Sequence, residues 1–270
     1  MPFSSTHTWL VLPAAGVGSR MQADRPKQYL SMTVKGITKT VIEHTLDHVL
    51  AYASSLSSNS IDAGFYKAVV VVTKGDPYWQ EISITRGYDL DERILVVEGG
   101  SERCYSVLNA LNVIHEIELK NKELTIRKNS ANQAWVAVHD VARPCLSYDD
   151  LDTLFLELED YNDGGILATP VRDTMKRGIV SDDGAVQNVA RIDHTVDRDQ
   201  LWHALTPQMF PLESLLNNLQ SALADGFEVT DEASAMEHAG AKPKLVSGRS
   251  DNLKITRPED LKLAEFYLNL

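Results

Sequence analysis

Short apolar runs bounded by turn residues alternate with helical patterns along most of the chain. Runs of this kind are typical of strands buried on both faces, and their alternation with helices is typical of a parallel sheet. The pattern therefore predicts an α/β fold, a Rossmann-like three-layer sandwich with a mostly parallel sheet. The expected strands are Trp9–Leu12, Lys67–Thr73, Arg93–Val97, Ala134–His139, Gly165–Thr169, Pro243–Val246 and, more weakly, Leu253–Ile255.

Helical spacing of apolar residues fills much of the chain between these runs. Neither an internal repeat nor a dividing linker interrupts the pattern, so we expect residues 1–270 to form a single domain. Two polar stretches without periodicity, Ser54–Gly64 and Leu119–Gln133, are expected to be surface loops. The expected helices are Val41–Leu50, Tyr105–Ile117, one through Leu151–Leu158 with Ser147 as its N-cap, one through Leu212–Leu223 behind Pro211, and a last one opened by a capping box at Thr256–Glu259.

One polar segment breaks the alternation. Between Arg172 and Arg198, the turn Ser181–Gly184 separates two short strand-like runs, which predicts a β-hairpin arm over about 171–198. A hairpin that offers few residues to a core often docks on a second subunit, so the arm suggests a homodimer. The alternative is a solvated excursion from the domain surface.

The composition narrows the class of partner. The chain of 270 residues carries a net charge of −12, which argues against a nucleic-acid or membrane-surface partner because both favour a basic face. No run is long enough to span a membrane, and residues 1–8 lack the features of a secretory signal. Two distant cysteines without metal-ligand spacing suggest reduced thiols in the cytoplasm.

The segment from Trp9 to Leu30 is the most informative for chemistry. An apolar strand leads into a loop of proline, alanine and glycine, which is followed by Arg20 and Lys27. Small residues let backbone N–H groups approach a phosphate chain, and fixed cations neutralise charge at a phosphorus centre. The loop lacks the third glycine of the dinucleotide fingerprint and the G-K-[ST] of a Walker loop. The sequence predicts a nucleoside-triphosphate site, with a plain strand-to-helix turn as the alternative.

Three further clusters follow expected strands. Gly99–Arg103 opens a helix, a position that favours anions, and Ser106 lies one turn further on. Asp140, in the run His139–Pro144, is suited to bind Mg²⁺ or a substrate hydroxyl; an Asp–Arg ion pair of structural purpose is the alternative. Lys254 lies in a nearly apolar run, which suggests a phosphate contact or a snorkelling side chain.

Other features favour simple structural roles. His44 and His48 lie four residues apart on an expected helix, but the zinc-protease pattern is missing, so a helix-surface pair is expected. Thr230–Glu232 is expected to cap a helix, its acids stabilised by the helix dipole. No order of Ser, His and Asp, or of Cys and His, suggests covalent catalysis.

Taken together, these motifs resemble the 2-C-methyl-D-erythritol 4-phosphate cytidylyltransferase family. The matching blocks are in order and cover nearly the whole chain. They are Pro13–Met21, Pro26–Leu30, Gly99–Val107, His139–Pro144, Ala168–Lys176, His194–Arg198, Leu205–Gln208, Thr230–Ala235 and Asn252–Thr256.

The resemblance implies a transfer of CMP from CTP to 2-C-methyl-D-erythritol 4-phosphate, with Mg²⁺ bridging the triphosphate oxygens and Asp140 as a further candidate metal ligand. Arg20 and Lys27 would stabilise the transition state at the α-phosphate. The residues implied to contact CTP are Pro13, Ala14, Ala15, Gly16, Gly18, Gly100, Ser101, Ser106 and Val141. Those implied to contact the acceptor are Asp140, Arg143, Thr206 and Lys254, with Thr174 and Arg198 reaching from the arm of a partner subunit.

Departures from the family pattern are small. Val141 replaces the usual alanine and crowds the ribose side. Two other functions remain open at this point. One is a cytidylyltransferase that acts on ribitol 5-phosphate, and the other is a nucleotide-binding dimer without turnover.

Overall fold

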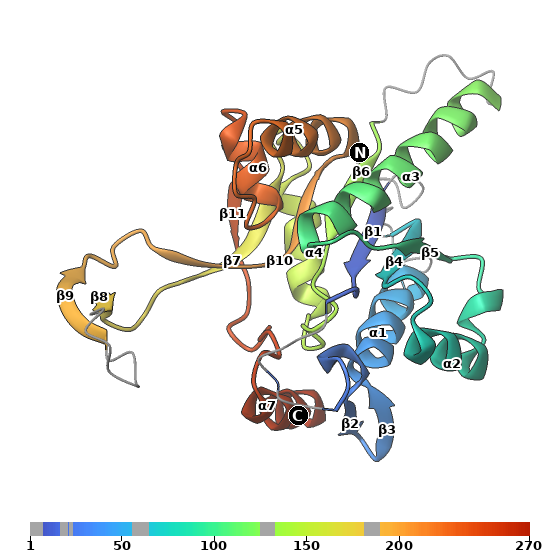
Figure 1. Cartoon of the computed structure of the whole chain (residues 1–270), viewed down its shortest axis with the longest axis horizontal. Coiled ribbons are helices and arrows are strands. Elements are labelled where there is room, and N and C mark those ends of the chain that lie inside the picture. The colour runs from blue at the N-terminus through green and yellow to red at the C-terminus, as the bar shows by residue number, and fades with distance from the viewer. Residues whose placement is uncertain (1–7, 17–20, 22–23, 56–64, 125–132, 181–189) are drawn as a thin grey trace.

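The computed structural model describes residues 8–16, 21, 24–55, 65–124, 133–180 and 190–270. A seven-stranded sheet in the order β11-β7-β10-β6-β1-β4-β5 lies at its centre (Figure 1). Every neighbouring pair is parallel except the two formed by β10, so the sheet is mostly parallel, as predicted. The strands are β1 (Thr8–Pro13), β4 (Lys67–Val72), β5 (Ile94–Glu98), β6 (Trp135–Val138), β7 (Gly165–Pro170), β10 (Trp202–Pro211) and β11 (Lys244–Ser247).

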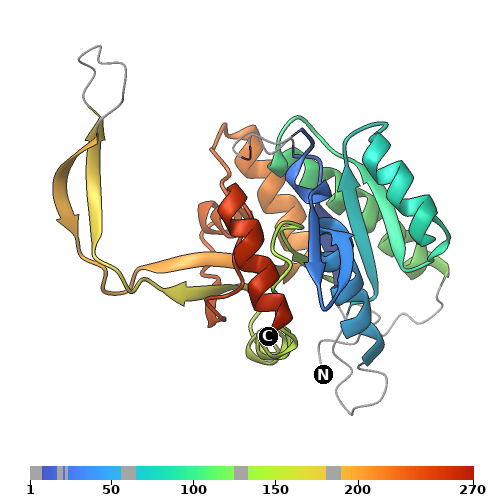
Figure 2. The ribbon, with the colours of Figure 1, turned by 90° about the horizontal axis from the view of Figure 1, so that it is seen from below.

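Alternate strand residues bury opposite faces of this sheet. Leu10 and Leu12 pack with α1 (Val41–Ser55), α2 (Pro77–Arg86) and α4 (Tyr148–Glu157). Trp9 and Val11 pack with α3 (Arg103–Leu124), α5 (Leu212–Ala224) and α6 (Glu232–His238) on the other face. Helices therefore cover both faces (Figures 1 and 2), which confirms the three-layer prediction.

A smaller cluster packs the end of the chain against the body. Ala264 of α7 (Pro258–Asn269) lies with Ile255 and with Met32 of β2 (Ser31–Val34), which pairs with β3 (Ile37–Thr40). The predicted strand at Leu253–Ile255 is wrong. This run forms no ladder with a strand, and the Ile255 N–H instead donates to the Ala142 carbonyl in the loop after β6.

The helix caps follow the sequence closely. The Ser147 hydroxyl accepts the Asp150 N–H at 3.1 Å, and the Asp231 carboxylate accepts the Ser234 N–H at 3.0 Å, as expected of N-caps. In the last helix the capping acid is Asp260, one residue later than expected, and it accepts two backbone N–H groups at 2.8 Å. Asp231 and Asp260 thus accept backbone N–H groups at helix starts, where the helix itself provides no partner.

The boundaries predicted for the two surface loops differ from those in the structure. Residues 119–124 continue α3 instead of starting a loop, and residues 54–55 belong to α1. The remainders, 56–64 and 125–132, lie outside the described residues. Within the ranges that the structure describes, no helix has the length and apolar character needed to cross a membrane.

The hairpin arm is present. Strands β8 (Met175–Val180) and β9 (Ala190–Val196) pair antiparallel and project from the body on the extensions of β7 and β10 (Figure 2). The expected turn at Ser181–Gly184 lies outside the described residues. Among the described residues of the arm, the large apolar side chains of Met175, Ile179 and Ile192 are exposed. An arm that buries so little of its own surface gains stability by contact with another surface.

Candidate active site

A cavity of about 330 Å³ opens at the carboxyl ends of β1, β5 and β6. The chain continues from β1 to its neighbour β4 on one side and later enters β6 on the other, so the cavity lies at a switch point of the sheet, where α/β proteins bind ligands. Eleven predicted site residues line it: Pro13, Ala14, Ala15, Gly16, Lys27, Gly100, Ser101, Ser106, Asp140, Val141 and Lys254. Gln28, Glu102, Arg103 and Ala142 complete the lining.

Two side chains from neighbouring segments bind carbonyl groups of the first loop. The buried Gln28 amide donates to the carbonyls of Ala14 at 2.6 Å and Gly16 at 3.0 Å, and the Thr73 hydroxyl donates to Ala15 at 3.1 Å. These bonds satisfy the three carbonyls and fix the course of the loop backbone. A Cβ at Gly16 would meet no atom of the described residues within 4 Å, so the bare backbone there faces open space.

The second glycine cluster packs tightly against the first loop. A Cβ at Gly99 would lie 2.5 Å from the Ala15 Cβ, and one at Gly100 would lie 2.4 Å from the Tyr105 Cβ. The Ser106 hydroxyl donates to the Glu102 carbonyl at 3.0 Å and accepts the Gly100 N–H at 3.1 Å. Glycine is required at position 99 because the first loop lies against it, and at position 100 because the first turn of α3 lies against it. Ser106 therefore shapes the loop as well as lining the cavity.

A buried carboxylate collects the cations of the site. Asp140 contacts the Lys254 Nζ at 2.7 Å, the Arg103 Nε at 3.2 Å and the Arg143 Nε at 3.7 Å. Burial alone would raise the pKa of the Asp140 carboxyl, but the charges of Arg103, Lys254 and Arg143 outweigh burial and hold that pKa well below its usual range. Asp140 is therefore ionised at neutral pH. Lys254 is a partner of this carboxylate, and both sequence interpretations had missed that contact.

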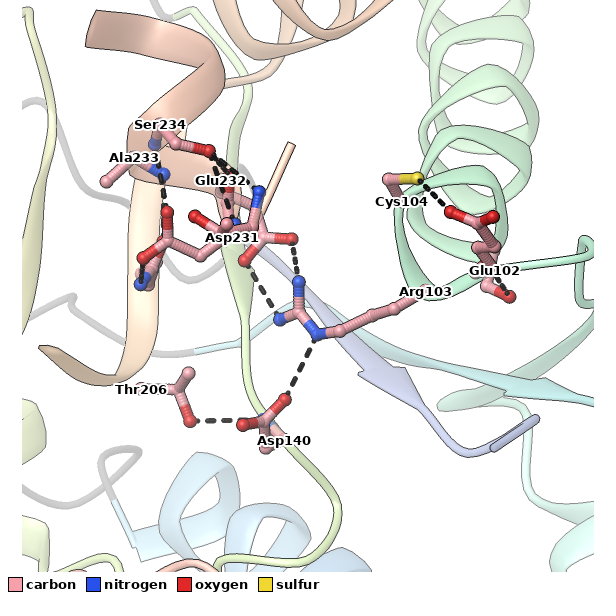
Figure 3. Close-up of polar contacts among 12 residues, drawn as sticks. Glu102, Arg103, Cys104, Asp140, Thr206, Asp231, Glu232, Ala233 and Ser234 are labelled. Carbon is pink, nitrogen blue, oxygen red and sulfur yellow. Dashed lines mark hydrogen bonds and ion pairs between the residues drawn. The ribbon is translucent and has the colours of Figure 1, made fainter. Parts of the chain in front are cut away.

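Arg103 joins Asp140 to a second carboxylate. Its Nη1 and Nη2 donate to the two oxygens of Glu232 at 2.7 and 3.0 Å, while its Nε donates to Asp140 (Figure 3). Burial alone would lower the pKa of the Arg103 guanidinium, but the Glu232 and Asp140 carboxylates raise it instead. The sequence motifs gave Arg103 no role and placed Glu232 only among the acids at a helix start. One sequence signal could have suggested this pair. Arg103 ends the glycine cluster Gly99–Arg103, and Glu232 ends the cap motif Thr230–Glu232, so each offers a charge beside a candidate motif.

His139 is buried and positions Asp140. Its Nε2 lies 3.0 Å from the Arg143 carbonyl, which can only accept, so we assign the proton to Nε2. Nδ1 then accepts the Thr206 hydroxyl at 2.9 Å, and the Thr206 oxygen accepts the Asp140 N–H at 3.1 Å. Burial lowers the pKa of His139 to about 4. Thr206, predicted to contact the acceptor, has its hydroxyl engaged in this chain of bonds.

Lys27 reaches the cavity from a short 3₁₀ helix, η2 (Lys27–Tyr29). Its ammonium donates to the Ile255 carbonyl at 2.8 Å, beside the run that carries Lys254. This bond fixes the position of the positive charge at the cavity wall. An ammonium has three N–H donors, and this bond uses one of them. Gly18 and Arg20, the other predicted residues of this segment, lie outside the described residues.

The remaining predicted residues lie toward the arm. Arg143 and Lys254 line a second cavity of about 440 Å³ together with Arg172 and His203. Thr174 and Arg198 are exposed at the base of the arm, where the Arg198 guanidinium donates to the Arg172 carbonyl. Neither residue lines the first cavity of its own chain.

The donor set of the site is poor for a metal ion. Both Asp140 oxygens already face cations, at 3.2 Å for Oδ1 and 2.7 Å for Oδ2. Among the described residues, no three His, Cys, Asp or Glu side chains gather as metal ligands. A Mg²⁺ ion that keeps several waters and binds mainly phosphate oxygens fits this environment better than an ion held by the protein.

Small-residue loops at a sheet switch point, with lysine and arginine gathered around the same cavity, define an α/β nucleotidyltransferase. The comparisons give the particular family. The protein-family model of 2-C-methyl-D-erythritol 4-phosphate cytidylyltransferase matches residues 8–270, and the chain belongs to this family.

Similar proteins align with this chain over nearly their full lengths. A 2-C-methyl-D-erythritol 4-phosphate cytidylyltransferase of Vibrio vulnificus (strain CMCP6) is 48% identical over 269 residues, which cover 100% of this chain and 98% of that protein. The protein of the same name from Haemophilus influenzae (strain PittEE) is 50% identical over 258 residues, covering 96% and 95%. A crystal structure of the Francisella tularensis protein of that name has a TM-score of 0.69 at 30% identity, covering 97% of this chain and 99% of that one.

The buried His139 predicts a specific pH dependence of stability. Its pKa is about 4 in the folded chain and about 6.5 when unfolded, so the unfolded chain binds one more proton between these values. Stability is therefore complete above pH 6.5 and falls as the pH drops toward 4. When the pH is lowered from 7.5 to 5, the free energy of unfolding should fall by about 2 kcal/mol more in the native chain than in His139→Asn. Urea unfolding at the two pH values measures this difference. An equal loss in both proteins would show that His139 does not titrate in this way.

Proposed function

We propose that this protein transfers CMP from CTP to 2-C-methyl-D-erythritol 4-phosphate and releases pyrophosphate. A phosphate oxygen of the acceptor forms a bond to the α-phosphorus of CTP, and the bond from that phosphorus to the β-phosphate oxygen breaks. The product is 4-diphosphocytidyl-2-C-methyl-D-erythritol. The observation that carries the proposal is one cavity in which two small-residue loops meet Lys27, Arg103 and Lys254. The names of full-length relatives at 48–50% identity support the substrates.

The chemistry calls for charge neutralisation and not for a general base. A phosphate monoester has its second pKa near 6, so the acceptor is already mostly a dianion at pH 7. The obstacle is the repulsion between this dianion and the triphosphate, and alignment by fixed cations lowers it. His139 is unsuited to act as a base, since both ring nitrogens are engaged and its pKa is about 4.

We assign the two halves of the cavity to the two substrates. The loop Pro13–Gly18 would bind the triphosphate through N–H groups beyond Ala14, whose own N–H donates to the Val71 carbonyl. Gly100, Ser101, Ser106 and Val141 would lie around the nucleoside. Lys27 and Arg20 would stabilise the charge that builds up at the α-phosphate. The bonds that fix the Ala14, Ala15 and Gly16 carbonyls support this assignment, because they hold the loop backbone in one shape.

We propose that Mg²⁺ enters with CTP, held by the triphosphate oxygens and water. When bound, the ion would neutralise part of the triphosphate charge. The cations on Asp140 make direct binding of the metal by this carboxylate unfavourable.

The acceptor would lie beside Asp140, Arg143 and Lys254, with its phosphate reached by Thr174 and Arg198 from a second copy of the chain. Thr174 directly precedes β8 and Arg198 follows β9, and neither residue lines the first cavity of its own chain. The exposed Met175, Ile179 and Ile192 on the arm support an exchange of arms in a homodimer, because contact would bury them. We further propose a cytoplasmic location, supported by two buried cysteines that form no disulfide.

A panel of acceptors tests the function. We expect the protein to release pyrophosphate from CTP rapidly with methylerythritol phosphate, slowly with ribitol 5-phosphate and hardly at all without an acceptor. The measurement is continuous detection of pyrophosphate. A faster reaction with ribitol 5-phosphate would favour the other cytidylyltransferase, and no release with any acceptor would favour a binding dimer without turnover.

Removal of a transition-state cation should lower turnover more than binding. Lys27→Ala, and likewise Arg20→Ala, should lower kcat by roughly 100-fold or more while the affinity for CTP falls much less. The exposed Lys262→Ala on α7 is the matched control and should keep full activity. Steady-state kinetics and CTP titration measure the two effects. Equal losses in kcat and in CTP affinity would contradict the assignment.

Mixed dimers test the exchange of arms. Arg198→Ala should mainly raise the KM for methylerythritol phosphate, whereas Lys27→Ala disables the cavity. In a mixed dimer, one site combines an intact Lys27 with an intact Arg198 from the partner. Random mixing should therefore restore about a quarter of native activity at low acceptor concentration, since half the dimers are mixed and each has one complete site. Activity no higher than that of the unmixed variants would show that the arm acts within its own subunit.

A further inference from the structure

Glu232 is a buried carboxylate outside the roles assigned so far. It opens α6 with only 3% of its surface exposed, and both of its oxygens are bound by Arg103 (Figure 3). A buried charge is costly unless it is paired and fully hydrogen-bonded. The helix does not need this carboxylate as its cap, because Asp231 and Ser234 already form a capping box. Glu232 therefore serves Arg103.

The geometry of Arg103 makes this pairing directional. A guanidinium is planar, so two parallel bonds from Nη1 and Nη2 to one carboxylate fix the plane of the whole group. The third bond, from Nε to Asp140 at 3.2 Å, then points in a set direction. Arg103 is also the first residue of α3, directly after the loop of Gly99–Ser101. One side chain thus joins the nucleotide loop to the carboxylate on the acceptor side.

The far end of the pair is held rigidly. The Gln208 amide in β10 donates to the Asp231 carboxylate at 2.8 Å and accepts the Ala233 N–H at 2.9 Å. Thr206, on the same strand, binds the Asp140 N–H. Strand β10 therefore binds both the first turn of α6 and the backbone of Asp140. Glu232, through Arg103, links the same two parts of the chain a second time.

We propose that Glu232 is a positioning residue for the acceptor. By fixing the Arg103 guanidinium, it sets the orientation of Asp140 relative to the loop of Gly99–Ser101. The proposal rests on the proposed function, in which Asp140 faces the methylerythritol moiety. A residue that served stability alone would lower the unfolding midpoint without separating the kinetics of the two substrates.

The test compares Glu232→Gln with Glu237→Gln, which removes the same charge from an exposed position on the same helix. We expect Glu232→Gln to lower kcat/KM for the acceptor about tenfold while the KM for CTP stays within about twofold. Glu237→Gln should change neither. In an Arg103→Gln background, Glu232→Gln should cause no further loss, because its effect passes through Arg103. Equal losses for both substrates, or a full further loss in that background, would overturn the proposal.

A crystal structure of Glu232→Gln gives a readout that does not depend on the reaction. The Arg103 guanidinium should leave its present plane and lose the Nε contact with Asp140, and Glu237→Gln should retain this contact. An unchanged contact would overturn the positioning role even if activity falls. If the native protein prefers another phosphorylated polyol, the proposed function fails, and the same kinetic comparison with that acceptor still tests Glu232.

Discussion

The ion cluster around Asp140 is the interaction on which the site depends, since it lets three cations lie close together around one buried carboxylate. Arg103 comes from α3, Arg143 follows β6 and Lys254 precedes α7, and all three meet a carboxylate that is buried. Without that carboxylate, the positive charges would repel one another in an environment of low dielectric constant. Glu232 adds a second negative charge behind Arg103. The cluster thus concentrates cations in a chain whose net charge is −12.

This arrangement suits a reaction between two anions. The N–H groups of Ala14, Gly99 and Gly100 are bound by Val71, Val72 and Ser106 and hold the two loops in place. N–H groups of the first loop beyond Ala14 would meet a phosphate without reorganisation. Gln28 and Thr73 bind the loop carbonyls, and the Ile255 carbonyl binds the Lys27 ammonium. His139 and Thr206 fix the backbone of Asp140. The protein therefore contributes prearranged charge and alignment, and the nucleophile comes with the substrate.

Most of the sheet could be predicted from the sequence because its strands are apolar on both faces, as the run Lys67–Val72 shows. Strand β10 could not, because Thr206, Pro207 and Gln208 interrupt its apolar pattern. The structure tolerates them at a shift in register between Ala204 and Gln208, where both polar side chains find partners. Leu253–Ile255 has the opposite character, an apolar run whose side chains fill a cluster without joining the sheet.

The candidate site shows the same division. Local motifs predicted the residues whose role depends on loop shape, such as Gly16 and Gly100. The contacts of Arg103 with Glu232, separated by 129 residues, depend on how α3 and α6 pack, and no local pattern contains that information. Gln28 was missed for a similar reason, since its amide serves carbonyls twelve and fourteen residues away. Sequence patterns thus located the loops, whereas the ion pairs that orient them depend on tertiary packing.

The most direct measurement of the central claim is a crystal structure of the protein with CTP and Mg²⁺. The account predicts the triphosphate against the loops at Ala14–Gly16 and Gly100–Ser101, with the Lys27 ammonium within hydrogen-bond distance of the α-phosphate. A triphosphate bound outside this cavity, with Lys27 still on the Ile255 carbonyl and no phosphate contact, would contradict it.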